Sequence, residues 1–219
     1  MAKEDQKKYR DALEQAKKEF AKRSLTRVLE VSGAEPYDQS ELTIRYGGKL
    51  YRVKHPEGEI SPCEINENRA RVEITDQILI LQYLTEVCGV QPSGKWISFR
   101  ELPGGNNHYA SFKLEAMEPL AKHFGSSPAE FEIACHKLGG RKLTMGDRAF
   151  VIPALPRLHL AFILWLADEE GSARANILFD ANASMHLNTE ALEVLGINVA
   201  ERIIDLTVNQ EEQQNQFTL

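Results

Sequence analysis

Residues 158 to 167 constrain the fold most, because two sets of side chains alternate there over ten consecutive positions. Large apolar residues occupy every second position, and the positions between them carry a mixed set that includes His159, Ala161, Ile163 and Trp165. A period of two is typical of a β-strand, whose successive side chains point to opposite faces of a sheet. The segment therefore predicts a long strand with one wholly apolar face.

Two further strand-like segments, 148 to 152 and 174 to 180, flank this one across short loops at 153 to 157 and 168 to 171. Short loops favour an antiparallel meander. The apolar residues Ala175, Ile177 and Phe179 must join the apolar face, and a one-residue slip would move them to the other side of the sheet. The register that satisfies this condition predicts Arg174 opposite Trp165 and Asp180 opposite His159.

A second hairpin is predicted over residues 42 to 53, where Gly47-Gly48 provides the positive φ angles of a tight turn. It either extends the first sheet or forms a small one. Helical spacing and capping residues predict helices at the following positions: an amphipathic N-terminal helix through Leu29, one capped by Thr75-Asp76, one after Asn106 or Asn107, short ones from Pro119 and Ser127, and two at the C-terminus separated by Gly196.

These elements predict an α+β fold in which helices pack against an antiparallel sheet, with core strands at about 148–152, 158–167 and 174–180 and an N-terminal hairpin at 42–53. Residues 1–208 are expected to form one domain, because no linker or repeat interrupts them. The segment 209–219 is rich in glutamine and glutamate and is expected to be a flexible polar tail.

Composition narrows the range of functions. The net charge of −6 and the pI near 5.6 provide no positive field for nucleic acid, so no nucleic-acid partner is expected. No apolar run reaches the roughly 20 residues that cross a bilayer, and no signal segment opens the chain, which favours a soluble, cytoplasmic protein without a membrane partner. Cys63, Cys88 and Cys135 are spaced unlike metal or cluster ligands, and the histidines form no metal-binding spacing, so no metal site is predicted.

Several motifs together resemble a known family. They are Trp96 to Gly105, Pro119-Leu-Ala, Gly146-Asp147, Ala154 to Leu158, Asp168-Glu-Glu170 and Ile177 to Asp180, supported by Ser32-Gly33-Ala34 and Pro56 to Glu59. As a set they resemble a family of anaerobic bacteria and archaea that is catalogued as a domain of unknown function. The likeness covers residues 9 to 204.

The resemblance implies a link to anaerobic metabolism, because some members look fused to an iron–sulfur module similar to that of corrinoid iron–sulfur proteins. This chain lacks the cysteines of that module. The family pattern has a proline where this chain has His159, so the resemblance implies no family role for that histidine. The cofactor remains unknown.

An Asp180–His159 pair is a weak catalytic candidate, because an adjacent carboxylate orients the imidazole and favours its charged form. A cross-strand ion pair is the structural alternative. The acidic residues at 168 to 170 cannot join it, since the returning strand separates them from Asp180 by about 20 Å.

The ligand-binding candidates are Arg100, Gly104, Gly105, Arg157 and Trp165. The glycines precede a helix whose N-terminal amides favour anions, and arginine binds carboxylates with two parallel donors. A capped turn and an arginine that binds loop carbonyls are the structural alternatives.

The absence of a catalytic motif favours a non-catalytic ligand-binding or accessory protein of anaerobic metabolism, related to corrinoid, iron–sulfur or one-carbon chemistry. Its expected partners are a small anionic ligand or cofactor and a protein of that metabolism. An enzyme acting on a small anionic substrate is the first alternative, and a structural or interaction protein with an open sheet face is the second. A ligand site should be concave with convergent polar groups, whereas an interaction surface should be flat and apolar.

Overall fold

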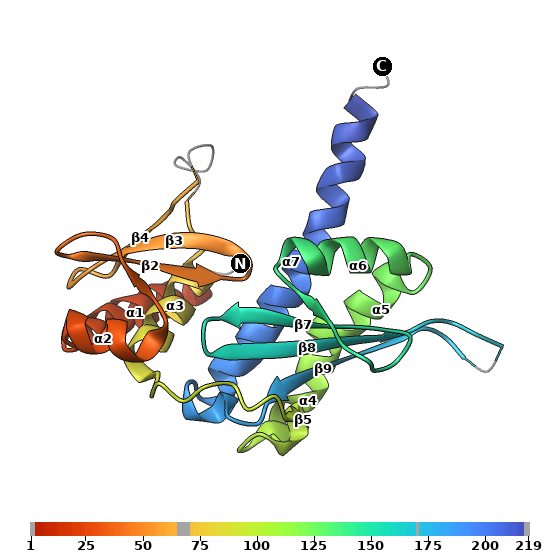
Figure 1. Ribbon diagram of the computed structural model, residues 1–219, viewed down its shortest axis with the longest axis horizontal. Helices are drawn as coiled ribbons and strands as arrows, with labels where there is room; N and C mark the ends of the chain where they lie inside the picture. Colours follow the sequence, from red (N-terminus) through yellow and green to blue (C-terminus); the bar gives the residue numbers. More distant parts are fainter. Residues whose placement is uncertain (1–2, 65–70, 170, 217–219) are drawn as a thin grey trace.

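A computed structural model describes residues 3–64, 71–169 and 171–216, with side chains for 6–64, 71–169 and 171–207. It contains helices and two antiparallel sheets, which confirms the predicted α+β class. The first sheet has the strand order β1-β2-β3-β4 and the second β5-β9-β8-β7-β6 (Figure 1).

The N-terminal half combines the first sheet with three helices that lie on one side of it in Figure 1. Its elements are α1 (Lys3–Ala21), α2 (Leu25–Ser32), β1 (Glu35–Pro36), β2 (Glu41–Tyr46), β3 (Lys49–Lys54), β4 (Glu59–Pro62) and α3 (Ile74–Glu86). The predicted N-terminal helix is thus two helices, because Ser24 caps a new start by accepting a hydrogen bond from the Arg27 amide.

The predicted hairpin is confirmed as β2 and β3. Tyr46 pairs with Lys49 across Gly47 and Gly48, both of which have positive φ. The face that carries Leu42, Ile44, Tyr51 and Val53 is buried. The hairpin belongs to the smaller sheet and does not extend the larger one.

The C-terminal half holds the five-stranded sheet and the remaining helices. Its elements are β5 (Trp96–Ser98), η2 (Phe99–Glu101), α4 (Gly105–Phe112), η3 (Lys113–Met117), α5 (Glu118–Phe124), α6 (Pro128–Lys137), β6 (Arg141–Lys142), β7 (Arg148–Leu155), β8 (Leu158–Trp165), β9 (Arg174–Asp180), η4 (Ala183–Met185) and α7 (Thr189–Gln216).

The register of the central strands follows the prediction. Trp165 pairs with Arg174 at one end, and the pairing continues without a shift to Leu160 and Phe179 at the other. Phe162 and Ile177 are fully buried against the helices on that side. The sequence pattern therefore identified both the apolar face and the strand pairing.

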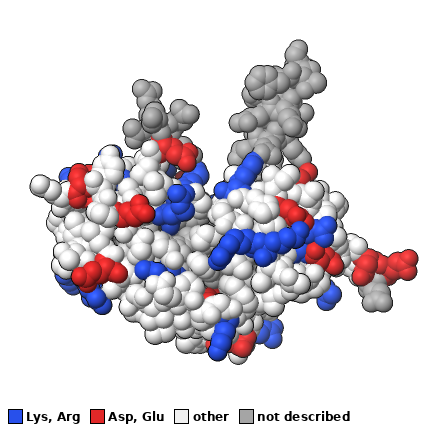
Figure 2. All heavy atoms as spheres, viewed as in Figure 1, with Lys and Arg blue, Asp and Glu red and all other residues white. Residues whose placement is uncertain are grey.

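The opposite face of this sheet, which we term the open face, points toward the viewer in Figure 1. Its buried residues Ala149, Ala161 and Ile163 lie outside the hydrophobic cluster that joins the rest of the core. Figure 2 shows the same side, with basic side chains running over the region of β6 and β7. On the opposite, helix-covered face, Lys142 and Arg148 pair with Glu132 on α6.

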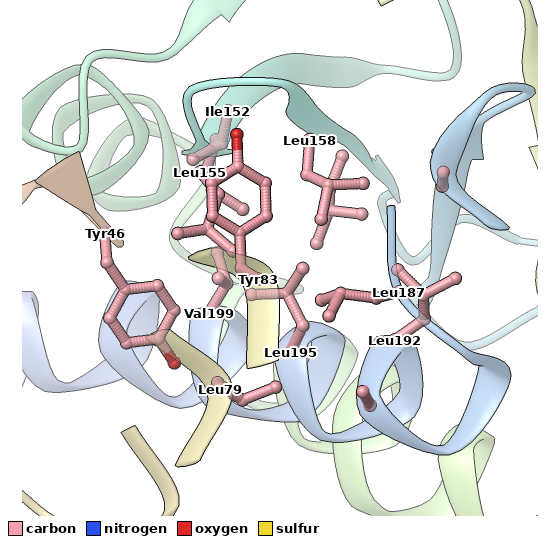
Figure 3. Packing of buried hydrophobic residues seen from close by; sticks show 14 of the residues in the cluster. Tyr46, Leu79, Tyr83, Ile152, Leu155, Leu158, Leu187, Leu192, Leu195 and Val199 are labelled. Carbon is pink, nitrogen blue, oxygen red and sulfur yellow. The ribbon is translucent and has the colours of Figure 1, made fainter. Parts of the chain in front are cut away.

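One hydrophobic cluster spans both sheets, so the two halves share a core. Figure 3 shows the junction, where Leu79 and Tyr83 of α3 lie among Leu155, Leu195 and other apolar residues of β7, β8 and α7. The Tyr83 hydroxyl donates to the Ser32 carbonyl at 2.7 Å and accepts from the Arg157 amide at 3.0 Å. Its buried ring therefore links α2 to the β7–β8 turn.

Three helix boundaries differ from the predictions. Helix α7 continues through Gly196, where the Phe112 ring approaches so closely that a Cβ would lie 2.6 Å from it. Helix α4 starts after Gly104 and not after Asn106 or Asn107. Helix α3 starts at Ile74, so Asp76 lies in its first turn and is not a cap.

The segment predicted as a tail lies partly in α7, which continues to Gln216, and residues 217–219 lie outside the described part of the chain. None of the described helices combines the length and the apolar character needed to cross a membrane.

Candidate functional site

A cleft of about 620 Å³ lies between the helical segment 105–124 and the β8–β9 hairpin, and we term it the Trp165 cleft. Its lining combines two aromatic rings with charged and small side chains: Tyr109, Lys113, Met117, Glu118, Ala121, Trp165, Ala173, Arg174, Ala175 and Asn176. A concave site with convergent polar groups is the usual form of a ligand pocket.

The helical wall contains a π-helical turn, η3, between α4 and α5. The Glu118 amide donates to the Lys113 carbonyl, one residue further than in an α-helix. Pro119 follows directly and has no amide to donate, which already interrupts the α-helical pattern there. Such turns are often found at functional sites, and this one contributes Lys113 and Met117 to the cleft.

The strand wall places an aromatic ring beside a cation. Trp165 and Arg174 are directly opposite in the β8–β9 pair, where facing side chains lie about 5 Å apart at the Cβ atoms. Trp165 is half-buried and Arg174 is exposed. The two side chains therefore lie side by side on the same face of the sheet.

Some charged side chains at the cleft form ion pairs and others do not. Lys113 forms an exposed ion pair with Glu118 at 3.3 Å. Arg100 lies above the Tyr109 ring at 3.9 Å from the ring centre, a cation–π geometry. Within the described residues, neither Arg100 nor Arg174 has a carboxylate partner. The cleft thus carries one cation, Arg174, that its own carboxylate does not neutralise, and Arg100 lies behind its Tyr109 wall.

The structure brings some of the predicted ligand residues together. Trp165 lines the cleft, and Arg100 contacts the Tyr109 ring that lines it. Gly104 and Gly105 begin the helix that carries Tyr109. Gly105 packs against the Phe99 carbonyl, where a Cβ would overlap at 1.9 Å, and its amide donates to the Leu102 carbonyl at 2.9 Å.

Arg157 lies elsewhere, in the turn that precedes β8, whereas Trp165 ends that strand. Its guanidinium binds the Gln91 side chain, and its amide binds the Tyr83 hydroxyl. Its Nε atom is buried and has no hydrogen-bond partner. Arg157 therefore connects the 87–95 loop to the β7–β8 turn and is not part of the Trp165 cleft.

Asp180 binds the same loop and forms no hydrogen bond or ion pair with His159 among the described residues. Its carboxylate accepts from the Ser93 amide at 3.0 Å, the Gly94 amide at 2.7 Å and the Asn182 amide at 2.9 Å. Burial alone would raise the pKa of Asp180, but these donors together hold it below its usual value.

Asp180 acts on His159 in the expected direction, because its charge favours the protonated imidazole, but it is not the dominant influence. Burial is the largest influence and lowers the pKa of His159, and Arg141 lowers it further. Burial therefore favours the neutral form of the half-buried His159.

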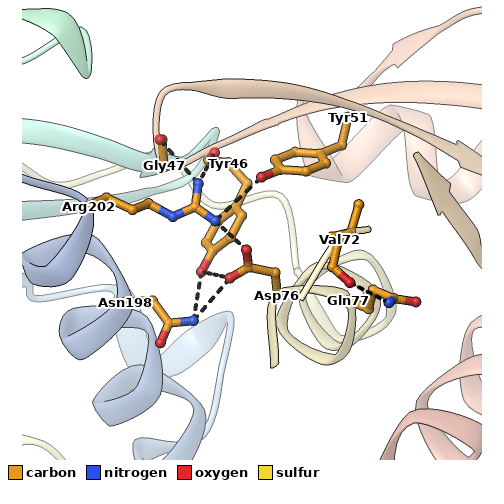
Figure 4. Close-up of polar contacts among 8 residues, drawn as sticks. All are labelled: Tyr46, Gly47, Tyr51, Val72, Asp76, Gln77, Asn198 and Arg202. Carbon is orange, nitrogen blue, oxygen red and sulfur yellow. Dashed lines mark hydrogen bonds and ion pairs between the residues drawn. The ribbon is translucent and has the colours of Figure 1, made fainter. Parts of the chain in front are cut away.

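Sequence reasoning missed a buried polar network between the two halves, which we term the Arg202 network (Figure 4). Arg202 of α7 pairs with Asp76 of α3, and the Tyr46 hydroxyl donates to the same carboxylate at 2.9 Å. Asn198 donates to Asp76 at 3.1 Å. The only sequence signal was Asp76 itself, which the pattern assigned to a helix cap.

The remaining donors of Arg202 are also used. One guanidinium nitrogen donates to the Tyr46 and Gly47 carbonyls at 3.2 and 3.3 Å, and the group stacks on the Tyr46 ring at 4.3 Å. Burial is the main cause that raises the pKa of both Tyr46 and Tyr51, so both phenols stay protonated. The network holds the hairpin turn, α3 and α7 together.

A second hollow of about 620 Å³ lies beside the Arg202 network and is lined in part by Lys49, Lys137 and Arg202. Arg202 is already neutralised by Asp76, so its charge is not available to an added anion. The Trp165 cleft is therefore the better candidate ligand site. No group of three or more metal-ligating side chains occurs in the described ranges 3–64, 71–169 and 171–216.

A family model described as a domain of unknown function, DUF3786, matches residues 24–202. The chain belongs to the DUF3786 family. The matched residues include both sheets and the residues that line the Trp165 cleft. Searches of curated proteins and of solved structures gave no match.

Proposed function

We propose that this DUF3786 protein is a non-catalytic binding protein that holds a small anionic ligand with a planar group in the Trp165 cleft. The observation that carries the proposal is the meeting of Arg174, which has no carboxylate partner in the described residues, with the Trp165 ring. Guanidinium groups bind carboxylates and phosphates through paired donors, and aromatic rings bind planar groups by stacking.

The lining of the cleft supports binding over catalysis. Among the described residues that line it there is no serine, cysteine or histidine, and its one carboxylate, Glu118, is paired with Lys113. A hydrolytic or transfer reaction needs a nucleophile or a general base within reach of the substrate. The absence of these nucleophiles from the described lining supports recognition as the role of the cleft.

We further propose that the protein acts in the cytoplasm as an accessory component of anaerobic metabolism, where its partner carries corrinoid, iron–sulfur or one-carbon chemistry. The support is the family resemblance and the three free thiols, which suit a reducing compartment. The described residues offer no ligand set for an iron–sulfur cluster. Any such cluster would belong to the partner protein.

The first test identifies what the protein holds when it is made. The protein is purified without oxygen, denatured to release bound small molecules, and the released molecules are analysed by mass spectrometry. The proposal expects an anion with a planar group.

A second test separates the two recognition elements. In a Trp96→Phe background, the fluorescence of Trp165 is followed during titration with AMP, adenosine and inorganic phosphate. AMP has both ring and charge, whereas each of the other probes has one of them. Quenching by AMP at a lower concentration than by either single-feature probe is expected. A ligand-free protein that responds equally weakly to all three would contradict the proposal.

A further inference from the structure

Cys88 and His186 form a thiol–imidazole pair at a place remote in sequence. Cys88 follows the end of α3, and His186 follows η4, 98 positions later. The Cys88 Sγ atom lies 3.7 Å from His186 Nδ1, within hydrogen-bond distance for sulfur. The pair belongs neither to the Trp165 cleft nor to the Arg202 network.

The three cysteines differ in their surroundings. Cys135 is fully buried and Cys63 partly so, and burial raises the pKa of both thiols. Cys88 is exposed, so a reagent in solution can reach it. Reactive cysteines are typically accessible and lie beside a group that takes up the thiol proton.

His186 meets the second condition. Its side chain is 1% exposed, so the ring is held in place. Burial is the largest influence and lowers its pKa. Asp180 and the Val90 carbonyl act against this shift, while Arg157 acts with it. The ring is therefore neutral near pH 7, with Nδ1 directed at the thiol.

Arg157 provides a charge beside this pair. It is close enough to influence His186, and its buried Nε atom has no hydrogen-bond partner. The charged groups around the imidazole are thus Asp180 from β9 and Arg157 from the β7–β8 turn. Asp180 is already bound by three backbone amides, so the cation is the group left to attract an anion.

We propose that Cys88 is a reactive thiol, activated by His186, that exchanges with the disulfides of small anionic thiols. The thiol proton passes from Sγ to Nδ1 of His186, and the thiolate attacks one sulfur of the disulfide. A new sulfur–sulfur bond forms to Cys88, the original one breaks, and the departing thiolate takes the proton from the imidazolium. Cys88 is oxidised and the leaving sulfur is reduced, so no other oxidant is needed.

The test compares two chromogenic disulfides on the full chain. 5,5′-Dithiobis(2-nitrobenzoate) carries two carboxylates, whereas 4,4′-dithiodipyridine is neutral near pH 7. Release of the chromophore at pH 7 is expected to be faster than for free cysteine with the same reagent, and Cys88→Ser should remove this fast phase. Cys63→Ser, the matched control, should keep it. A fast phase that persists in Cys88→Ser would overturn the proposal.

Two variants separate the roles of the neighbours. His186→Gln is expected to slow both reagents at least tenfold at pH 7. Arg157→Gln should slow the dianionic reagent severalfold more than it slows the neutral one. Should His186→Gln not fold, the pH–rate profile of the unmodified protein replaces it: reaction persisting below pH 7 supports activation. A profile that follows an ordinary thiol, with a midpoint about 8.5, would overturn it.

Discussion

The Trp165 cleft and the Arg202 network use the same chemistry for different ends. Each combines an arginine with an aromatic ring beside a hollow of about 620 Å³. In the network, Arg202 is bound by a carboxylate, two carbonyls and two phenols. In the cleft, Arg174 has no carboxylate partner in the described part of the chain. A satisfied arginine stabilises the fold, whereas an unsatisfied one is available to a ligand.

The largest expected effect follows from breaking the satisfied pair. Arg202→Met leaves the Asp76 carboxylate buried and unpaired, and we expect it to lower the free energy of unfolding by about 3 kcal/mol. Urea denaturation measures the change. The double variant Asp76→Leu/Arg202→Met should lose less than the single one, because no charge remains buried. A single-variant loss below about 1 kcal/mol would place Arg202 with the ligand-binding arginines.

Asp180 should contribute to stability as Asp76 does, because donors of the protein itself also bind its carboxylate. Asp180→Asn removes the charged acceptor from three amides and is expected to cost about 2 kcal/mol at pH 7. The folded-state pKa is lowered, so this stability is present above the unfolded pKa of about 3.9 and is lost as the pH falls through the folded-state value.

The difference between Asp180→Asn and the unmodified protein should therefore shrink below about pH 4. Asp11→Asn, on the exposed face of α1, is the matched control and should change stability by less than about 0.5 kcal/mol. A penalty for Asp180→Asn that stays constant with pH would mean that the carboxylate charge is not its source.

The sequence predicts the features that neighbouring residues determine. It does not predict those that depend on contacts between residues far apart in the chain. The β8–β9 register follows from a local pattern, because the short loop at 168–171 and the need to keep Ala175, Ile177 and Phe179 on the apolar face together select it. The Gly47-Gly48 turn is equally local. The break expected at Gly196 is wrong because glycine there serves a contact with Phe112, which no local pattern indicates.

The sequence predicts only some residues of the candidate site, for the same reason. Arg100, Gly104, Gly105 and Trp165 were selected from their local motifs, but Tyr109 and Trp165 meet only through the packing of α4 on the sheet. Cys88 and His186 are 98 positions apart, so no local pattern indicates their contact. Whether an arginine is satisfied depends on distant residues, so Arg157 and Arg174 look alike in sequence.

Replacing Arg174, the arginine of the cleft, should affect ligand affinity more than stability, the opposite of what we expect for Arg202. Arg174→Gln is expected to change the free energy of unfolding by less than about 0.5 kcal/mol, because Arg174 is exposed and unpaired. The affinity of the Arg174→Gln variant for AMP should fall about tenfold, because one charge-assisted hydrogen bond is lost. Fluorescence titration measures this, and Arg27→Gln on α2 is the control. Unchanged AMP affinity would remove Arg174 from the site.

The smallest effect is expected at Arg100, which reaches the cleft only through the Tyr109 ring. Arg100→Gln removes a cation–π contact of about 0.5–1 kcal/mol, so AMP affinity should fall roughly two- to fivefold. Arg100→Lys keeps the charge and should recover part of it. A larger loss than for Arg174→Gln would shift the centre of the site toward α4.

The order of α3 and α7 along the chain has a consequence for synthesis. Asp76 leaves the ribosome 126 residues before Arg202, the cation that neutralises it. Until then α3 carries a carboxylate that lacks its partner Arg202, and the N-terminal half exposes an apolar surface that α7 later covers. Chains that terminate before α7 should therefore fold poorly, and we expect chaperones to bind them and proteases to degrade them.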